Sequence, residues 1–241
     1  MSQLDHWPAA ARRRPSRGEP TWAIRAALAT WLSKEAAEAA KAFDGRPYRV
    51  LDVGCGVKPY YPFFQPFAGE YVGIDPQYPD ADLKGTVEDM PVPDGSFDVV
   101  LCTQVLEHCP DPDRAVRELR RVTAPGGRVL ASTHGVMVYH PNPDDLWRWT
   151  HAGLQRLFER NGSWARITIT PNAGTGSCVT TLLATYANLL GERAHVAPLG
   201  RGVVRLLNRI GPLLDRSSSL LRDPVPGSLF SNYHVLAEVS P

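Results

Sequence analysis

Cysteine is scarce in this 241-residue chain, and its spacing excludes the sites that cysteine usually builds. The four cysteines show no paired C-x-x-C arrangement and are Cys55, Cys102, Cys109 and Cys178. Small secreted domains depend on dense disulfides, and structural zinc sites need closely spaced ligands. We therefore expect reduced thiols, no disulfide framework and no metal site, as in a cytoplasmic protein.

Long hydrophobic runs and an excess of one charge are also lacking. Every apolar run is interrupted by Arg, Gly or Pro before the roughly 18 residues that a membrane span needs, and no secretory signal is visible. The formal net charge is +1, which creates no field that would gather nucleic acid from a distance. The composition thus favours neither a membrane span nor a nucleic-acid partner.

The chain is expected to form one principal domain with an N-terminal appendage. With 43% hydrophobic residues, a chain of this length buries a core of ordinary size. Residues 1–43 are interpreted as a loose leader, 1–20, followed by a cap helix at Thr21–Phe43, where apolar residues recur at helical spacing. Residues 44–241 would form the domain, with a lid loop at about 134–150 and a helical insertion at about 174–219.

Strand and helix signals alternate after residue 44, a pattern typical of a layered α/β fold. Strands without polar alternation indicate burial on both faces, as in a parallel sheet. Helices are expected at Asp111–Val122, Ala152–Arg160, Cys178–Leu190 and Val203–Leu214. Strands are expected at Tyr48–Val53, Tyr71–Ile74, Leu83–Val87, Phe97–Cys102, Arg128–Ser132, Trp164–Thr170 and Tyr233–Val239.

A glycine turn follows the first strand, in the run Val50-Leu-Asp-Val-Gly-Cys-Gly56. Glycines there let the backbone approach a ligand closely and point amides at a carboxylate or a phosphate. A Gly-x-Gly turn after a strand also opens dinucleotide sites. Here Pro59 replaces the third glycine of that fingerprint, which argues against a pyrophosphate on a tightly packed helix.

Three further motifs follow in order. Tyr71-Val-Gly-Ile-Asp75 places an acid roughly 20 residues past the glycine turn, the spacing at which a carboxylate meets a ribose. Glu88-Asp89-Met90 offers an acid for an amino group and a thioether to cover a ring, although Met90 could equally be core. Ser96-Phe-Asp-Val-Val-Leu is a buried strand that runs into Thr103-Gln-Val-Leu-Glu-His108.

Taken in order, these motifs and Pro125-Gly-Gly resemble the class I S-adenosylmethionine (SAM)-dependent methyltransferases, in their type 11-like subgroup. The resemblance implies a Rossmann-like seven-stranded sheet, mostly parallel with a reversed last strand, and helices on both faces. The Tyr233–Val239 strand would pair beside Trp164–Thr170. The cofactor would be SAM, and by the resemblance its site would comprise Asp52, Gly54, Cys55, Gly56, Asp75, Pro76, Glu88, Asp89, Met90, Thr103 and Gln104.

Three histidines follow predicted strand ends, where ligands bind in open α/β sheets. Transfer to a hydroxyl needs a base, and imidazole suits that task near neutrality. We expect His140 or His134 to act before His108, with Asp144 and Asp145 orienting the ring; a helix cap or a packed lid without chemistry are the alternatives. Acceptor contacts are expected from the same loop, through Tyr139, Asp144, Trp147, Arg148 and Trp149.

The class of methyl acceptor is narrowed mainly by motifs that the sequence lacks. No Asn/Asp-Pro-Pro-aromatic tetrapeptide follows the Phe97 strand, which argues against amino-group methylation of adenine or glutamine, and no Pro-Cys pair suggests pyrimidine carbon methylation. The sequence favours a hydroxyl or amine of a small bacterial metabolite or sugar-like compound, as in natural product biosynthesis. An RNA or protein methyltransferase and a non-catalytic SAM-binding protein stay open as alternatives.

The basic segment Arg201–Arg216 has Leu and Ile at helical spacing but no interleaved aromatics for stacking on bases. It is interpreted first as a packing helix or a homodimer helix. A membrane-surface helix is the next alternative.

Overall fold

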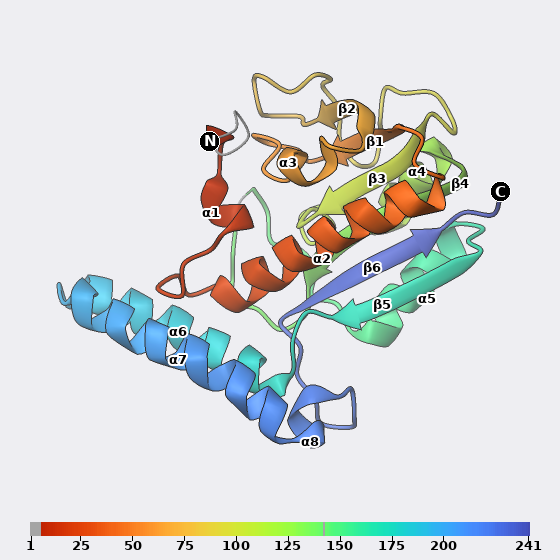
Figure 1. The fold of residues 1–241 in the computed structure, drawn as a ribbon. Helices are drawn as coiled ribbons and strands as arrows, with labels where there is room; N and C mark the ends of the chain where they lie inside the picture. Colours follow the sequence, from red (N-terminus) through yellow and green to blue (C-terminus); the bar gives the residue numbers. More distant parts are fainter. Residues whose placement is uncertain (1–5, 142) are drawn as a thin grey trace.

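The protein is described here by a computed structural model covering residues 6–141 and 143–241. A six-stranded sheet forms its centre, with strand order β2-β1-β3-β4-β6-β5 (Figure 1). The strands are β1 (Tyr48–Val53), β2 (Ala68–Ile74), β3 (Phe97–Thr103), β4 (Thr123–His134), β5 (Arg166–Pro171) and β6 (Asn232–Glu238). The first four run parallel, whereas β6 is antiparallel to both β4 and β5. The expected reversed last strand and its pairing beside the Trp164–Thr170 strand are confirmed.

The sheet has six strands rather than the expected seven, because the Leu83–Val87 segment makes no ladder. Leu83 forms one isolated parallel bridge to Ile74, and Thr86 turns back to bridge Asp89. A Cβ on Gly85 would lie 2.7 Å from the Pro91 ring and 3.0 Å from the Asp89 carbonyl oxygen. The chain therefore folds tightly on itself there, and its backbone groups are not extended for pairing.

Helices cover both faces of the sheet. On one face lies the long helix α2 (Trp22–Ala42), together with the short α3 (Tyr61–Phe64). Leu28, Leu32, Ala36 and Ala39 of α2 pack there against strand side chains. The opposite face is covered by α4 (Pro112–Val122) and α5 (His151–Asn161), whose buried residues include Leu119. This two-sided burial explains why β1 and β3 are nearly continuous apolar runs.

Two long helices lie outside this layered core. They are α6 (Thr175–Arg193) and α7 (Ala197–Ser217), inserted between β5 and β6 and followed by the short α8 (Ser219–Arg222). Figure 1 shows them side by side, projecting away from the sheet. Across the described ranges, none of the helices combines the length and apolar character that crossing a membrane requires.

The described part of the N-terminal leader, residues 6–20, contains a short helix and contacts the rest of the protein. Residues Ala10–Arg13 form the short helix α1. The Trp7 indole donates to the Lys58 carbonyl oxygen at 2.8 Å, and its ring lies 4.5 Å from that of Tyr61. Arg13 donates to the Pro59 carbonyl oxygen at 2.6 Å. These contacts fix the leader over the glycine-turn region.

The α2 interface provides a stability test. Leu32 is fully buried between α2 and the sheet, so Leu32→Ala should lower the free energy of unfolding by about 2 to 5 kcal/mol. Leu199→Ala is the control, because Leu199 is 68% exposed and should change it by less than about 0.5 kcal/mol. Urea denaturation measures both, and equal losses would contradict the described packing of α2.

Candidate active site

The glycine turn after β1 has two glycines that serve different needs. Gly54 has a φ of +65°, and a Cβ there would lie 2.5 Å from a Val105 methyl group. Gly56 has a φ of +46°, yet a Cβ there would meet nothing within 4 Å. The first glycine therefore allows close packing against the β3 loop. The second faces open space, as a ligand-binding turn requires.

Asp75, at the carboxyl end of β2, holds this turn in place. One carboxylate oxygen accepts from the Gly56 backbone amide at 3.0 Å. The other accepts from the backbone amides of Gln77 at 2.9 Å and Tyr78 at 2.8 Å. The carboxylate thus fixes both loops at this sheet edge and still faces a cavity.

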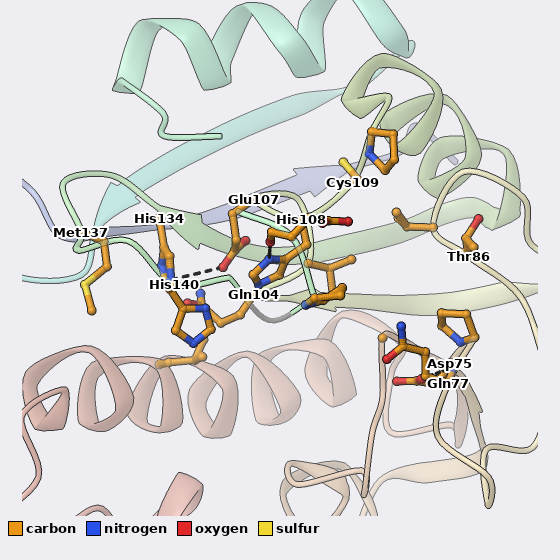
Figure 2. A pocket seen from close by; sticks show the side chains of 18 of the residues that line it. Asp75, Gln77, Thr86, Gln104, Glu107, His108, Cys109, His134, Met137 and His140 are labelled. Carbon is orange, nitrogen blue, oxygen red and sulfur yellow. Dashed lines mark hydrogen bonds and ion pairs between the residues drawn. The ribbon is translucent and has the colours of Figure 1, made fainter. Parts of the chain in front are cut away.

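That cavity, of about 490 Å³, lies at the carboxyl ends of the parallel strands. Figure 2 shows Asp75, Gln77 and Thr86 at one end and Glu107, His108, His134 and His140 at the other. It therefore joins the cofactor end and the acceptor end that the sequence predicts. The expected site residues that line it are Gly54, Asp75, Pro76, Glu88, Gln104, His108, His134, His140 and Asp144.

Several expected cofactor residues do not line the cavity. Met90 is 3% exposed and belongs to the hydrophobic core beneath α4, which favours its alternative interpretation as core. Asp52 is buried and accepts from the Tyr71 hydroxyl at 2.7 Å, and desolvation raises its pKa to about 7. Cys55, Gly56, Asp89 and Thr103 are likewise outside the lining.

The tryptophans of the predicted lid loop contact each other and the loop after β3 rather than the cavity. The Trp147 indole donates to the Cys109 carbonyl oxygen at 2.8 Å, and its ring stacks on that of Trp149 at 5.7 Å. Arg148 pairs with Asp145 and donates to the Val138 carbonyl oxygen. Tyr139 is 78% exposed. These four expected acceptor contacts, Tyr139, Trp147, Arg148 and Trp149, are not among the lining residues.

The three histidines gather at the acceptor end, with ring centroids 5.7 Å apart for His108 and His140 and 6.1 Å for His134 and His140. His108 Nδ1 lies against the Asp144 carbonyl oxygen. Because a carbonyl only accepts, that nitrogen carries the proton, and Nε2 of the neutral ring keeps a free lone pair. Asp145 bonds the His140 backbone amide rather than its ring.

His134 is held differently, by a buried polar chain. Asn232 Nδ2 lies 3.2 Å from His134 Nδ1 and 3.1 Å from Gln104 Oε1. Since the amide donates, His134 Nδ1 accepts and its proton sits on Nε2, 3.6 Å from Glu107 Oε1. Burial lowers the pKa of His134. This ring is therefore a weak base at neutral pH, and the lone pair of Nδ1 is already occupied by Asn232.

Glu107 was missed by sequence reasoning, although it lines the cavity. Its side chain is fully buried, and one oxygen accepts from the Thr133 hydroxyl at 2.8 Å. The other has no hydrogen-bond partner. Desolvation raises the pKa of Glu107 to about 7, which favours the protonated carboxyl beside the imidazole of His134. Only its place in the run Val-Leu-Glu-His hinted at this role.

Arg12, Arg25 and Tyr60 were also missed, and all three line the cavity from its N-terminal side. Lys58, by contrast, pairs with Asp82 and does not line it. No motif marks Arg12 or Arg25, because contacts of the leader and of α2 bring them there. The cations of this cavity therefore come from the N-terminal segment.

Comparison with known proteins agrees with this geometry. A profile of the methyltransferase domain matches residues 23–168, which is more than half of the chain. The chain belongs to the class I SAM-dependent methyltransferases. Its cofactor is SAM, and the open space beside Gly56, next to the Asp75 carboxylate, fits a ligand that carries both amine and ribose groups.

Curated relatives match only part of this methyltransferase. It is 32% identical over 103 residues to the uncharacterized methyltransferase YcgJ of Bacillus subtilis, covering 36% of this chain and 41% of that one. It is 30% identical over 160 residues to the ubiquinone biosynthesis O-methyltransferase of Pseudomonas aeruginosa, covering 55% and 65%. The chain thus spans about two fifths to two thirds of the length of these relatives.

Solved structures share the fold at lower identity. A putative sarcosine dimethylglycine methyltransferase from Galdieria sulphuraria has a TM-score of 0.53 at 15% identity, covering 88% of this chain and 84% of that one. The Haemonchus contortus phosphoethanolamine N-methyltransferase 2 complex with SAM has a TM-score of 0.50 at 16% identity, covering 86% and 52%. The [4+2]-cyclase SpnF reaches 0.53 at 19%, covering 86% and 80%. These likenesses establish the Rossmann-like architecture alone.

Replacing Glu107 by Gln tests whether the Glu107–His134 pair is neutral. The pKa of Glu107 is raised in the folded protein. Its protonated carboxyl therefore stabilises the fold fully below the pKa of an ordinary carboxyl, and this stabilisation is lost as the pH rises through the folded pKa. Gln keeps the shape of the side chain but does not ionise, so the variant does not lose stability in this way. The Tm of Glu107→Gln minus that of the wild type should therefore increase from about pH 5 to about pH 8.

Glu159→Gln, at an exposed position of α5, serves as the matched control and should show no such trend. Differential scanning calorimetry in equal buffers measures all three proteins. A Tm difference that stays flat over this range would contradict the raised pKa of Glu107.

Proposed function

We propose that this protein transfers the methyl group of SAM to a hydroxyl or an amine of a small-molecule acceptor. The observation that carries the proposal is a single cavity that holds Gly54 and Asp75 at one end and three histidines at the other. When bound, SAM supplies a methyl group on a positively charged sulfur, which a nucleophile displaces in line. The protein's own task is alignment, exclusion of water and acceptance of a proton.

The cofactor end is assigned to the residues around the glycine turn. Gly54 and Gly56 give the backbone room for the methionine end, and Asp75 faces the ribose hydroxyls while keeping its bonds to three backbone amides. Glu88, which also lines the cavity, is placed to accept from the adenine amino group. Arg12 and Arg25 supply positive charge for the methionine carboxylate, a role that Lys58 does not fill.

At the acceptor end the hydrogen bonding favours His108 and His140 over His134 as the base. His108 has its proton directed to the Asp144 carbonyl oxygen, so Nε2 is free to accept a proton. His134 has no free lone pair and a lowered pKa, and it acts instead as a fixed wall together with Glu107. This changes the order expected from the sequence, in which His134 preceded His108.

The acceptor class rests on size and on the relatives. A cavity of about 490 Å³ is within the range of small-molecule sites, and the lid loop closes one side of it. A relative named as a ubiquinone biosynthesis O-methyltransferase and a fold neighbour named as a phosphoethanolamine N-methyltransferase are consistent with oxygen or nitrogen acceptors. A metabolite of natural product biosynthesis, a cytoplasmic location and a homodimer remain predictions.

Asp75→Ala tests the cofactor end. Loss of a charged acceptor should weaken SAM binding by at least about tenfold, since Asp75 also orders the glycine turn. Isothermal titration calorimetry with SAM measures the affinity, and Asp80→Ala, an exposed acid five residues away, is the control. Wild-type affinity in Asp75→Ala would refute the assignment of the ribose site.

His108→Ala tests the base. Turnover, followed as S-adenosylhomocysteine release with a panel of small phenols, sugars and amines, should fall by about a hundredfold or more while SAM affinity is kept. The wild-type rate should also fall as the pH drops below neutrality, because a protonated imidazole accepts no proton.

His195→Asn, in the exposed turn between α6 and α7, is the control and should keep full turnover. If His108→Ala and His140→Ala both kept near-normal rates with a flat profile between about pH 6 and 8, alignment alone would carry the reaction.

A further inference from the structure

The pair of helices α6 and α7, here called the hairpin, reverses the pattern of buried and exposed residues that is usual in soluble helices. Soluble amphipathic helices bury large apolar side chains and expose polar ones. The seam between α6 and α7 contains mostly small or polar residues instead. The buried residues of the two helices are Gly176, Ser177, Cys178, Thr180, Thr181, Ala184 and Gly191 of α6 and Gly200, Val204, Asn208, Gly211 and Asp215 of α7.

The glycines of this seam bring the two backbones into close contact. A Cβ on Gly191 would lie 3.0 Å from the Gly200 Cα, and one on Gly211 would lie 2.9 Å from the Ser177 Cα. Asp215 accepts from the Gly176 amide at 2.8 Å and from the Ser177 hydroxyl at 2.5 Å. A side chain at Gly191 or Gly211 would press against the backbone of the facing helix. Small residues at helix contacts are what helices use where an apolar medium surrounds them.

The large apolar side chains consequently face outward. They recur at intervals of three, four or seven residues, and so form a stripe along each helix: Val179, Leu183, Tyr186 and Leu190 on α6, and Leu199, Val203, Leu206 and Leu213 on α7. Leu183 is 53% exposed, Leu190 63% and Leu206 56%. Contiguous apolar surface of this kind marks an interaction site.

Positive charge accompanies these stripes. Residues 174–222 contain six arginines but only two acids, Glu192 and Asp215, and Asp215 is buried. The formal charge of this segment is therefore +4. Since the whole chain carries +1, the charges of the remaining residues sum to −3. Five of the arginines are exposed and have no ion pair among the described residues: Arg193, Arg201, Arg205, Arg209 and Arg216.

We propose that the hairpin docks on an anionic lipid surface. The outward stripes would enter the boundary between headgroups and acyl chains, and the arginines would bind lipid phosphates, as in interfacial amphipathic helices. The hairpin projects from the body of the protein (Figure 1), so the layered core does not block its approach.

The positive charge of the hairpin favours a lipid surface over a second copy of the chain as its binding partner. Two hairpins packed face to face would bring their arginines together, with only Glu192 exposed on each to offset them. An anionic bilayer matches both the apolar stripes and the charge. The docking is independent of the proposed methyl transfer, since no cavity residue lies on the hairpin.

The hairpin also contacts the segment that reaches the cavity. Asn208 Nδ2 of α7 donates to the carbonyl oxygens of Arg17 and Glu19 at 2.9 and 2.8 Å. Thr21 and Arg25, a few residues on, line the cavity. A docked hairpin would therefore place the N-terminal side of the cavity near the lipid surface.

Co-sedimentation of the full chain with two kinds of vesicle tests the proposal. The vesicles contain phosphatidylcholine alone or with about 30% phosphatidylglycerol, at physiological and at high ionic strength. We expect binding to the anionic vesicles at least about tenfold tighter than to the neutral ones, and loss of most of it at high salt. No binding, or equal binding to both, would overturn the proposal.

Two sets of variants locate the contact. Arg201→Gln with Arg209→Gln should weaken anionic vesicle binding by about tenfold or more, whereas the exposed control pair Arg114→Gln with Arg156→Gln should not. Leu183→Ser with Leu206→Ser should abolish it, whereas the exposed lid-loop variant Leu146→Ser should not. Thermal unfolding checks that each variant keeps the wild-type Tm.

Sedimentation velocity tests the alternative partner of the hairpin, a second copy of the chain. A chain that forms dimers abolished by Leu183→Ser with Leu206→Ser, and that binds no vesicle, would show that a second copy covers the hairpin. Loss of vesicle binding through the control arginines alone would equally overturn the proposal, because the contact would then lie on the layered core.

Discussion

The candidate site depends on a buried chain of polar side chains that joins three strands. Gln104 follows β3 with a left-handed φ of 57°, a costly conformation for a non-glycine residue. It is held there by bonds to Ser132 of β4 at 2.9 Å and to Asn232 of β6 at 3.1 Å. Asn232 then fixes His134, which faces Glu107. Because each buried donor must find an acceptor, one change in this chain would disturb all the others.

This constraint gives the reversed strand β6 a function. Asn232 is the first residue of β6 and lies opposite His134 in the register of β4. The antiparallel strand thus delivers an amide to the carboxyl edge of a parallel sheet, where the following loop carries the histidines. Asn232 and the end of β4 fix His134 opposite Glu107, whereas His108 lies in the loop after β3 and His140 in the lid loop after β4.

The core and the hairpin follow opposite packing rules within one chain. In the core, large apolar residues such as Leu119 and Leu130 are fully buried and polar groups lie at the edges. In the hairpin, Gly191 and Gly200 meet in the seam and Leu199 is exposed. The same chain therefore buries its large apolar residues in the core and exposes them on the hairpin.

The sequence by itself determined the features that depend on local spacing. Gly54, Gly56 and Asp75 could be read from the interval between two buried strands, and the reversed strand at Tyr233–Val239 from the family resemblance. The helices α4 and α5 followed from their apolar stripes, since helical periodicity is a local property. These features need no knowledge of what packs against them.

Only the tertiary structure decided features that depend on partners far along the chain. The Leu83–Val87 segment has strand composition, but Gly85 packs against Pro91 and its backbone finds no ladder. Arg12 reaches the cavity because Trp7 and Arg13 bind the loop at Lys58 and Pro59. The environments of His108, His134 and Glu107 are set by bonds to Asp144, Asn232 and Thr133 respectively. Periodicity carries no information on such contacts, because the partners are set by how the strands and loops meet in space.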